Sequence, residues 1–146
     1  MDIECVVDLR AVTGESPVWH GAEQRLYWVD IPGCTFNRYD PATGQNTVWK
    51  TPEMVGSCAV RAQGGFLLAM PSGFHGFDPA TETFERLGGP ENLPAGHRFN
   101  DGRTDPAGRF WAGTMHTSET SRQRGNLYSF SADHACRNEV SGFQIF

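Results

Sequence analysis

The run RLYWVD at residues 25–30 shows the pattern on which the rest of the chain is built. It is a short apolar segment that contains two aromatic rings and is bounded by charged residues, which is typical of a buried β-strand. Similar runs follow at residues 65–70 (GFLLAM) and 109–114 (RFWAGT). They recur at intervals of about forty residues, the length expected for one blade of a β-propeller.

Turn residues divide each repeat into shorter strands. The 17 glycines and 9 prolines interrupt the chain at short intervals, and no window keeps the helical spacing of apolar residues. The strings DPATG at residues 40–44 and DPATE at residues 78–82 suit type I turns, because Asp accepts backbone N–H bonds and Pro presets φ. Strands are therefore expected at residues 16–19, 25–30, 35–39, 45–50, 57–61, 66–70, 73–77, 83–87, 109–114, 125–130 and 135–140.

This pattern predicts an all-β chain made of about three four-stranded blades of a β-propeller, near residues 14–50, 55–88 and 98–140. Residues 141–146 are expected to begin a fourth blade. Propellers usually close a ring of about four to eight blades, so three blades are expected to leave the ring open. Open strand edges and uncovered apolar faces favour self-association.

Charge and composition restrict the classes of partner. The 146 residues are 38% hydrophobic, enough for a globular core, and carry a formal net charge of −5 without a basic run. This balance argues against binding to nucleic acid or to an anionic membrane surface. The chain begins without the basic and apolar parts of a signal peptide, and no apolar run approaches the roughly 20 residues that span a bilayer. We therefore expect a cytoplasmic protein whose four scattered cysteines are reduced thiols.

Glu15 and Asn100 occupy nearly the same place in two different blades. Glu15 precedes Arg25 by ten positions, and Asn100 precedes Arg109 by nine. In a propeller this place borders the axis, where carboxylate and amide oxygens suit Ca²⁺, Mg²⁺ or Mn²⁺, or Zn²⁺ in an open catalytic site. The alternative interpretation is that Glu15 lies at a surface strand end and that residues 100–102 form an ordinary turn.

Arg98 brings a fixed cation to within two residues of Asn100. Its guanidinium can bind a carboxylate, a phosphate or a sugar hydroxyl, although a lone arginine is more often one half of a surface ion pair. His97 and His116 are expected at the rim of a pocket, whereas most of the histidines are expected in exposed turns. The chain has neither a Gly-rich phosphate loop before a helix nor a G-x-S-x-G elbow, which argues against phosphate-loop and serine-hydrolase chemistry.

Taken together, the motifs resemble the family of gluconolactonase, senescence marker protein (regucalcin) and luciferin-regenerating enzyme. Five strings in the order and spacing of that family carry the resemblance, and they cover nearly the whole chain. They are GESPVW at residues 14–19, RLYWVDI at 25–31, YDPATG at 39–44, RFNDG at 98–102 and DPAGRFWAGTM at 105–115.

The resemblance implies a six-bladed propeller that binds one divalent metal ion on its axis and hydrolyses sugar lactones. Glu15 matches the family's first metal ligand. Arg98 and Asn100 match positions that contact the substrate, and Asp101 lies beside them as a further member of that site. The loop at residues 116–119 is similar to one from which some relatives contact the sugar through an acidic residue at the position of Ser118, and Glu119 is a candidate substitute.

The family's other two metal ligands, an Asn and an Asp that also transfers a proton, lie in later blades and match no residue of this chain. On the resemblance, the chain therefore looks like an N-terminal half, and its proton-transfer residue is unknown. Residues 1–10 match the strand that closes the last blade of the ring. Low activity and self-association are expected of such a half.

Two other functions stay open beside the sugar lactonase. One is a calcium-binding or regulatory propeller without catalytic activity. The other is a lactonase or esterase that acts on esters other than sugar lactones. Neither the lactone nor the metal, whether Ca²⁺, Zn²⁺, Mn²⁺ or Mg²⁺, is specified by the sequence.

Overall fold

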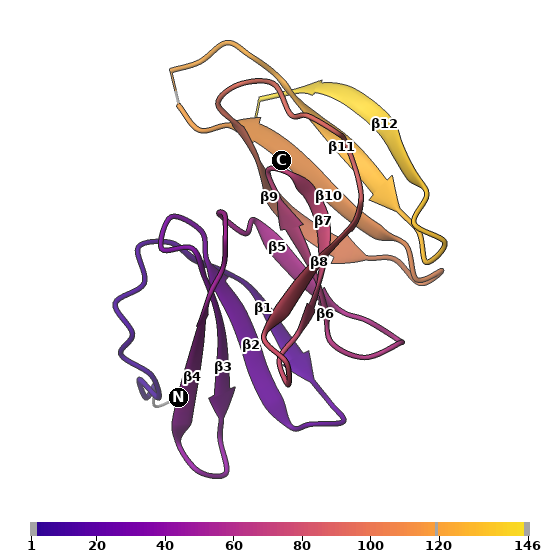
Figure 1. Cartoon of the computed structure of the whole chain (residues 1–146). Coiled ribbons are helices and arrows are strands. Elements are labelled where there is room, and N and C mark those ends of the chain that lie inside the picture. The colour runs from indigo at the N-terminus through magenta and orange to yellow at the C-terminus, as the bar shows by residue number, and fades with distance from the viewer. Residues whose placement is uncertain (1–2, 119, 145–146) are drawn as a thin grey trace.

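The computed structural model describes residues 3–118 and 120–144, which contain twelve strands and no helix. The strands form three four-stranded antiparallel sheets in the orders β1-β2-β3-β4, β5-β6-β7-β8 and β9-β10-β11-β12, here called blades 1, 2 and 3 (Figure 1). Their bounds are β1 Gly14–His20, β2 Arg25–Asp30, β3 Thr35–Asp40, β4 Gln45–Lys50, β5 Ser57–Val60, β6 Phe66–Met70, β7 Gly73–Asp78, β8 Thr83–Gly88, β9 His97–Thr104, β10 Phe110–His116, β11 Gly125–Phe130 and β12 Cys136–Phe143. The predicted all-β fold with three four-stranded blades is confirmed.

The end of blade 3 differs from the sequence prediction. Residues 141–143 were expected to begin a fourth blade, but they continue β12, where Ser141 pairs with Asn126 and Phe143 pairs with Gly125. Gly142 has a φ of 102° between these two pairs, and this conformation lets the strand continue past an irregular step in the ladder. Residues 145–146 lie outside the described part of the chain.

The N-terminal segment, which the resemblance assigns to closing the last blade, is not paired with any strand that the structure describes, and that assignment stays a prediction. Residues 3–10 contain no strand, and no described strand pairs with them. A strand needs a neighbouring strand to pair with its N–H and C=O groups, and the segment has no such neighbour among the described strands. It lies as irregular chain beside Leu26 and Trp28 of β2. Its end is held by Asp30, whose carboxylate accepts the N–H groups of Val12 and Thr13 at 3.0 Å each. Burial raises the pKa of Asp30, but these bonds outweigh that effect and lower it.

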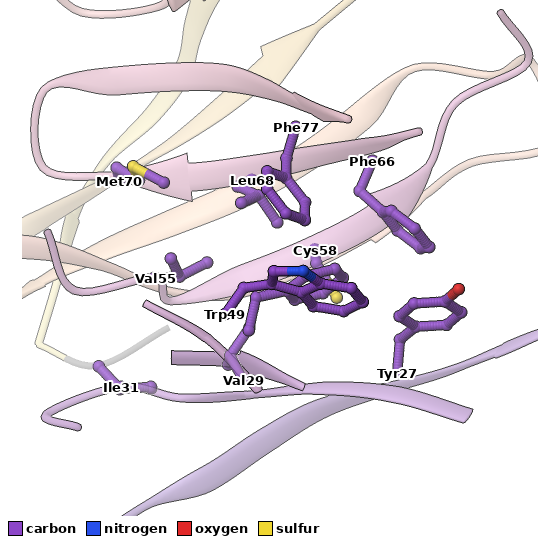
Figure 2. Packing of buried hydrophobic residues seen from close by; sticks show 11 residues of the cluster. Tyr27, Val29, Ile31, Trp49, Val55, Cys58, Phe66, Leu68, Met70 and Phe77 are labelled. Carbon is purple, nitrogen blue, oxygen red and sulfur yellow. The ribbon is translucent and has the colours of Figure 1, made fainter. Parts of the chain in front are cut away.

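Blade 2 is packed on both faces. The side chains of β6 alternate, so that Phe66, Leu68 and Met70 face blade 1 (Figure 2), whereas Leu67 and Ala69 face blade 3. All five are buried, which explains why this strand reads as an unbroken apolar run. The core between blades 1 and 2 consists of Tyr27, Val29, Ile31, Phe36, Trp49, Val55, Cys58, Phe66, Leu68, Met70 and Phe77.

The first strand of each blade lies toward the middle of the molecule. There β1, β5 and β9 contact one another, while β4 and β12 lie at the outside (Figure 1). Gly56 permits this approach, because a Cβ added to it would lie 2.4 Å from the Phe99 carbonyl oxygen. Between blades 1 and 2, the buried Ser16 Oγ accepts the Cys58 N–H at 3.0 Å. The three inner strands therefore form a close-packed support for side chains that project from them.

Candidate functional site

A β-bulge in β1 determines how Glu15 is presented. The ladder pairs Glu15 with Val29 and then Val18 with Tyr27, so one step is irregular. Ser16 lies in this irregular step with a φ of 52° and is buried against blade 2, whereas Glu15 is exposed. Because a bulge re-aims the side chains around it, β1 buries the serine and leaves the carboxylate accessible.

A second bulge lies in the corresponding part of β9. Ala112 pairs with Gly102 and Thr114 pairs with Phe99, so Asn100 and Asp101 share the irregular step between these pairs. Asp101 is exposed and accepts the N–H of Gly102 at 2.8 Å. The two innermost strands of blades 1 and 3 thus carry their polar residues at equivalent irregularities, as the similar spacing from Arg25 and Arg109 indicates.

Arg98 connects these groups. Its Nη1 donates hydrogen bonds to Asn100 Oδ1 at 2.7 Å and to the Phe99 carbonyl at 2.9 Å, which holds the guanidinium against its own strand. Burial lowers the pKa of Arg98, and the negative charge of Glu15 opposes this effect. The fold therefore brings Glu15 of blade 1 near enough to Arg98 of blade 3 for their charges to interact, although the two residues are far apart in the sequence.

The metal-binding capacity of this part of the chain is incomplete. Glu15 offers a carboxylate oxygen, which is the donor type that divalent cations prefer. Throughout residues 3–118 and 120–144, no group of three or more His, Cys, Asp or Glu side chains is arranged to hold a metal ion. Zn²⁺ takes about four ligands and Ca²⁺ about six to eight, so the described residues fit a metal in the type of donor but not in number.

The histidines differ from the sequence expectation. Most were expected to be exposed, but His20, His75 and His116 are partly buried, His97 is buried, and His134 is exposed. His97 and His116 pack at 5.2 Å between ring centroids beside Arg98. His97 is thus a buried packing residue in this structure, whereas His116 keeps part of its surface exposed, and the expected rim position of the two stays a prediction.

These two histidines also contact Ser118 and Arg124, which lie after β10 and before β11. His97 Nε2 contacts the Arg124 carbonyl at 3.3 Å, and His116 Nδ1 accepts the Ser118 N–H at 2.9 Å. Glu119, the candidate sugar contact, lies outside the described residues. Ser118 is exposed, and its hydroxyl lies 3.0 Å from that of Thr120.

Two polar groups were not identified from the sequence, one in an inner strand and one beside the β6–β7 turn. Ser57, in β5, is fully buried, and its hydroxyl has no hydrogen-bond partner among the described residues. It lies against Gly102, where a Cβ would come within 2.6 Å of Ser57 Oγ. In the β6–β7 turn, the Ser72 hydroxyl lies 2.8 Å from His75 Nε2. Ser57 and Gly102 are brought together only by the fold. Ser72 and His75 are three residues apart, a spacing that is visible in the sequence.

The chain is similar to known proteins over nearly its whole length. The model of the SMP-30/gluconolactonase/LRE-like region matches residues 13–146. The chain belongs to this family. Within it, the chain is 42% identical over 132 residues to 6-deoxy-6-sulfogluconolactonase of Pseudomonas putida, covering 90% of the chain and 45% of that relative. It is 37% identical over 137 residues to regucalcin of Xenopus laevis, covering 91% of the chain and 46% of the relative.

Solved structures of the SMP-30/gluconolactonase/LRE-like family show the same fold. A calcium-binding regucalcin from Agrobacterium tumefaciens superposes with a TM-score of 0.86 at 26% identity, over 93% of this chain and 45% of that one. A luciferin-regenerating enzyme superposes with a TM-score of 0.80 at 27% identity, over 90% of this chain and 46% of the other. The chain spans about half the length of the relatives that it matches.

Proposed function

We propose that this chain takes part in the metal-dependent hydrolysis of a sugar lactone. The observation that carries the proposal is the hydrogen bond from Arg98 to Asn100, with the charge of Glu15 acting on the same guanidinium. The family resemblance assigns Arg98 and Asn100 to the substrate and Glu15 to the metal. Relatives named as lactonases support the reaction class. The proposal concerns the whole active protein, of which these residues supply the part described here.

The polar groups suit a neutral, hydroxyl-rich substrate. The guanidinium of Arg98 can donate to sugar oxygens, and the exposed carboxylate of Asp101 can accept a sugar hydroxyl proton. Glu15 and Asp101 add negative charge to the positive charge of Arg98, which disfavours a multiply charged anion such as a phosphate ester. Binding of the hydroxyls would orient the lactone carbonyl, and such positioning is a substantial part of catalysis.

Glu15 is the residue that we assign to the metal. When bound, a divalent ion supplies Lewis-acid polarisation of the lactone carbonyl. Its other protein ligands and the group that transfers the proton are not assigned to residues of this chain. The role of Glu15 is therefore to contribute one oxygen ligand and negative charge.

The experiment that tests this function measures hydrolysis and metal binding together. Acid release from glucono-1,5-lactone is followed in a pH-stat after removal of metals with a chelator, and then with Ca²⁺, Zn²⁺, Mn²⁺ or Mg²⁺ added singly. Turnover above the spontaneous rate that returns with a metal supports the lactonase. A panel of non-sugar lactones and aryl esters in the same assay identifies an esterase if those substrates are preferred.

A calcium-binding protein without catalysis is the second candidate, and the structural similarity to a calcium-binding regucalcin favours it. It predicts calcium binding in titration calorimetry without hydrolysis of any lactone or ester. The two measurements therefore separate the candidates, because the first function requires turnover and the second requires its absence.

The proposed function also concerns the partners of the protein and its location. No described helix is long and apolar enough to cross a membrane. A small sugar lactone in the cytoplasm is the expected partner, with no nucleic acid. Exposed Ile3, Val12 and Trp19 support self-association, which light scattering over a range of protein concentrations tests.

A further inference from the structure

A cleft of about 560 Å³ lies between blades 2 and 3, away from Glu15 and Asn100. Its walls include the turns that follow β5, β9 and β11, whereas Glu15 lies near the start of β1 and Asn100 in the first half of β9. Both walls come from blades that the chain contains in full. Its volume is within the usual range of small-molecule sites.

The floor of this cleft is apolar. It is formed by side chains of both blades, namely Ala59, Leu67, Leu87, Phe110 and Phe130. Phe110 and Phe130 belong to the buried core between blades 2 and 3 and support the floor from below. The apolar surface that a ligand can reach includes the exposed Val60 and the partly buried Leu87. A ligand with an apolar body would gain free energy by covering this surface.

Arg61 places one uncompensated positive charge at the cleft. Its guanidinium has no hydrogen-bond or ion-pair partner among the described residues, and the residue is partly buried. It lies over the backbone of Gly76, where an added Cβ would come within 2.8 Å of Arg61 Nη1. The missing side chain at Gly76 therefore makes the space that the guanidinium occupies.

The other charged groups of the cleft have partners of their own. Arg109 forms a salt bridge of 2.8 Å with Asp105 and stacks on the Trp111 ring. Asp133 accepts the Ser131 hydroxyl and the Ala135 N–H, which lower its pKa. The exposed His134 ring stacks on Phe130 at 5.8 Å.

We propose that this cleft binds a small carboxylate with an apolar body, such as a medium-chain fatty acid. The carboxylate pairs with the guanidinium of Arg61 in a two-pronged hydrogen bond. The hydrocarbon chain covers the accessible side chains of Val60 and Leu87. A single negative charge matches the one unpaired guanidinium, and a doubly charged phosphate would be repelled by Asp133. This site is independent of the proposed lactonase site and requires no metal.

The test is a titration of the ¹⁵N-labelled chain with octanoate, followed by amide chemical shifts, with octanamide as the neutral analogue. We expect saturable shifts at Val60, Gly108 and Ala132 and weaker binding of octanamide. Arg61→Gln should weaken octanoate binding about tenfold, since a charge-assisted hydrogen bond is lost, and leave octanamide binding unchanged. Arg122→Gln, at an exposed arginine of the β10–β11 loop, is the matched control and should bind octanoate as before.

A second variant tests the location without changing charge. Ala132 is exposed in the β11–β12 turn, so the indole of Ala132→Trp should fill the cleft. The amide NMR spectrum should show that this variant keeps the fold. The substitution should abolish the binding of both ligands. The proposal is overturned if octanoate and octanamide bind equally well, if Arg61→Gln binds octanoate like the unaltered chain, or if the shifts map to residues 5–11 beside Trp28.

Discussion

Arg98 and Asn100, two residues apart on β9, are joined by a 2.7 Å hydrogen bond from the guanidinium to the amide oxygen. This bond fixes the orientation of both side chains at the bulge, and it gives the amide oxygen a partner within the protein. The strand therefore presents the two residues as one unit. Their separate contributions to binding are expected not to be additive.

Substitution of Arg98 by Ala should raise the KM for a sugar lactone about tenfold and change kcat less, because the guanidinium binds hydroxyls and also holds Asn100. Steady-state kinetics of the active protein that contains these residues measure both parameters. Arg122→Gln, with an exposed arginine removed elsewhere, is the control. An unchanged KM in Arg98→Ala would remove Arg98 from the substrate site.

Substitution of Glu15 by Gln should weaken divalent metal binding about tenfold or more, because an amide oxygen replaces a charged carboxylate ligand. Titration calorimetry with Ca²⁺ and Mn²⁺ measures the affinity independently of any turnover. Glu4→Gln, in the exposed N-terminal segment, is the control. If Glu15→Gln binds metal as tightly as the unaltered protein, Glu15 is not a ligand.

Gly56→Ala should destabilise the chain by about 1–3 kcal/mol, because the new methyl group would overlap the backbone carbonyl of Phe99 and force β5 and β9 apart. Urea unfolding followed by tryptophan fluorescence measures the change. Gly21→Ala is a matched control, since a Cβ there meets nothing within 4 Å, and it should stay within about 0.5 kcal/mol. Equal stabilities for the two variants would contradict the close contact of the inner strands.

Asp105 should make the stability of blade 3 depend on pH in the acid range. The Trp111 indole N–H and the N–H groups of Arg109 lower the pKa of Asp105 from 3.8 to about 2. Because the folded pKa is the lower one, its stabilising effect is present above pH 3.8 and is lost as the pH falls toward 2.

Thermal unfolding between pH 7 and pH 2.5 tests this effect of Asp105. Asp105→Asn should show a smaller loss of Tm across that window than the unaltered chain. Asp78→Asn alters the similar turn of blade 2, where the carboxylate accepts the Ala80 N–H, and serves as the control. A pH profile that Asp105→Asn leaves unchanged would show that this carboxylate does not contribute.

The strands were predictable where local chemistry determines them. The Asp-Pro turns at residues 40–44 and 78–82 satisfy their own backbone, since Asp40 and Asp78 accept the N–H groups of Ala42 and Ala80. The predicted range 45–50 coincides with β4, which follows the first of these turns. The predicted ranges 25–30, 66–70 and 125–130 coincide with β2, β6 and β11, whose runs of apolar and aromatic residues are typical of strands.

Features that depend on packing between blades were not predictable in this way. The continuation of β12 past Ser141 depends on pairing with β11, and the burial of His97 depends on His116 and the loop beyond it. At the candidate site, motif spacing indicated Glu15, Arg98 and Asn100 as candidates. The hydrogen bond from Arg98 and the bulges that expose Glu15 and Asp101 depend on contacts that no single strand contains.

The two-sided burial of β6 has a consequence for folding. Leu67 and Leu68 are neighbours in the chain but are buried in different interfaces, so blade 2 on its own would expose apolar side chains on both faces. The stability of blade 2 therefore depends on blades 1 and 3 at the same time. Loss of either neighbouring blade would weaken the packing of blade 2 against the other. The described chain should accordingly unfold in one cooperative transition, with the amide protons of β6 among the last to exchange with solvent.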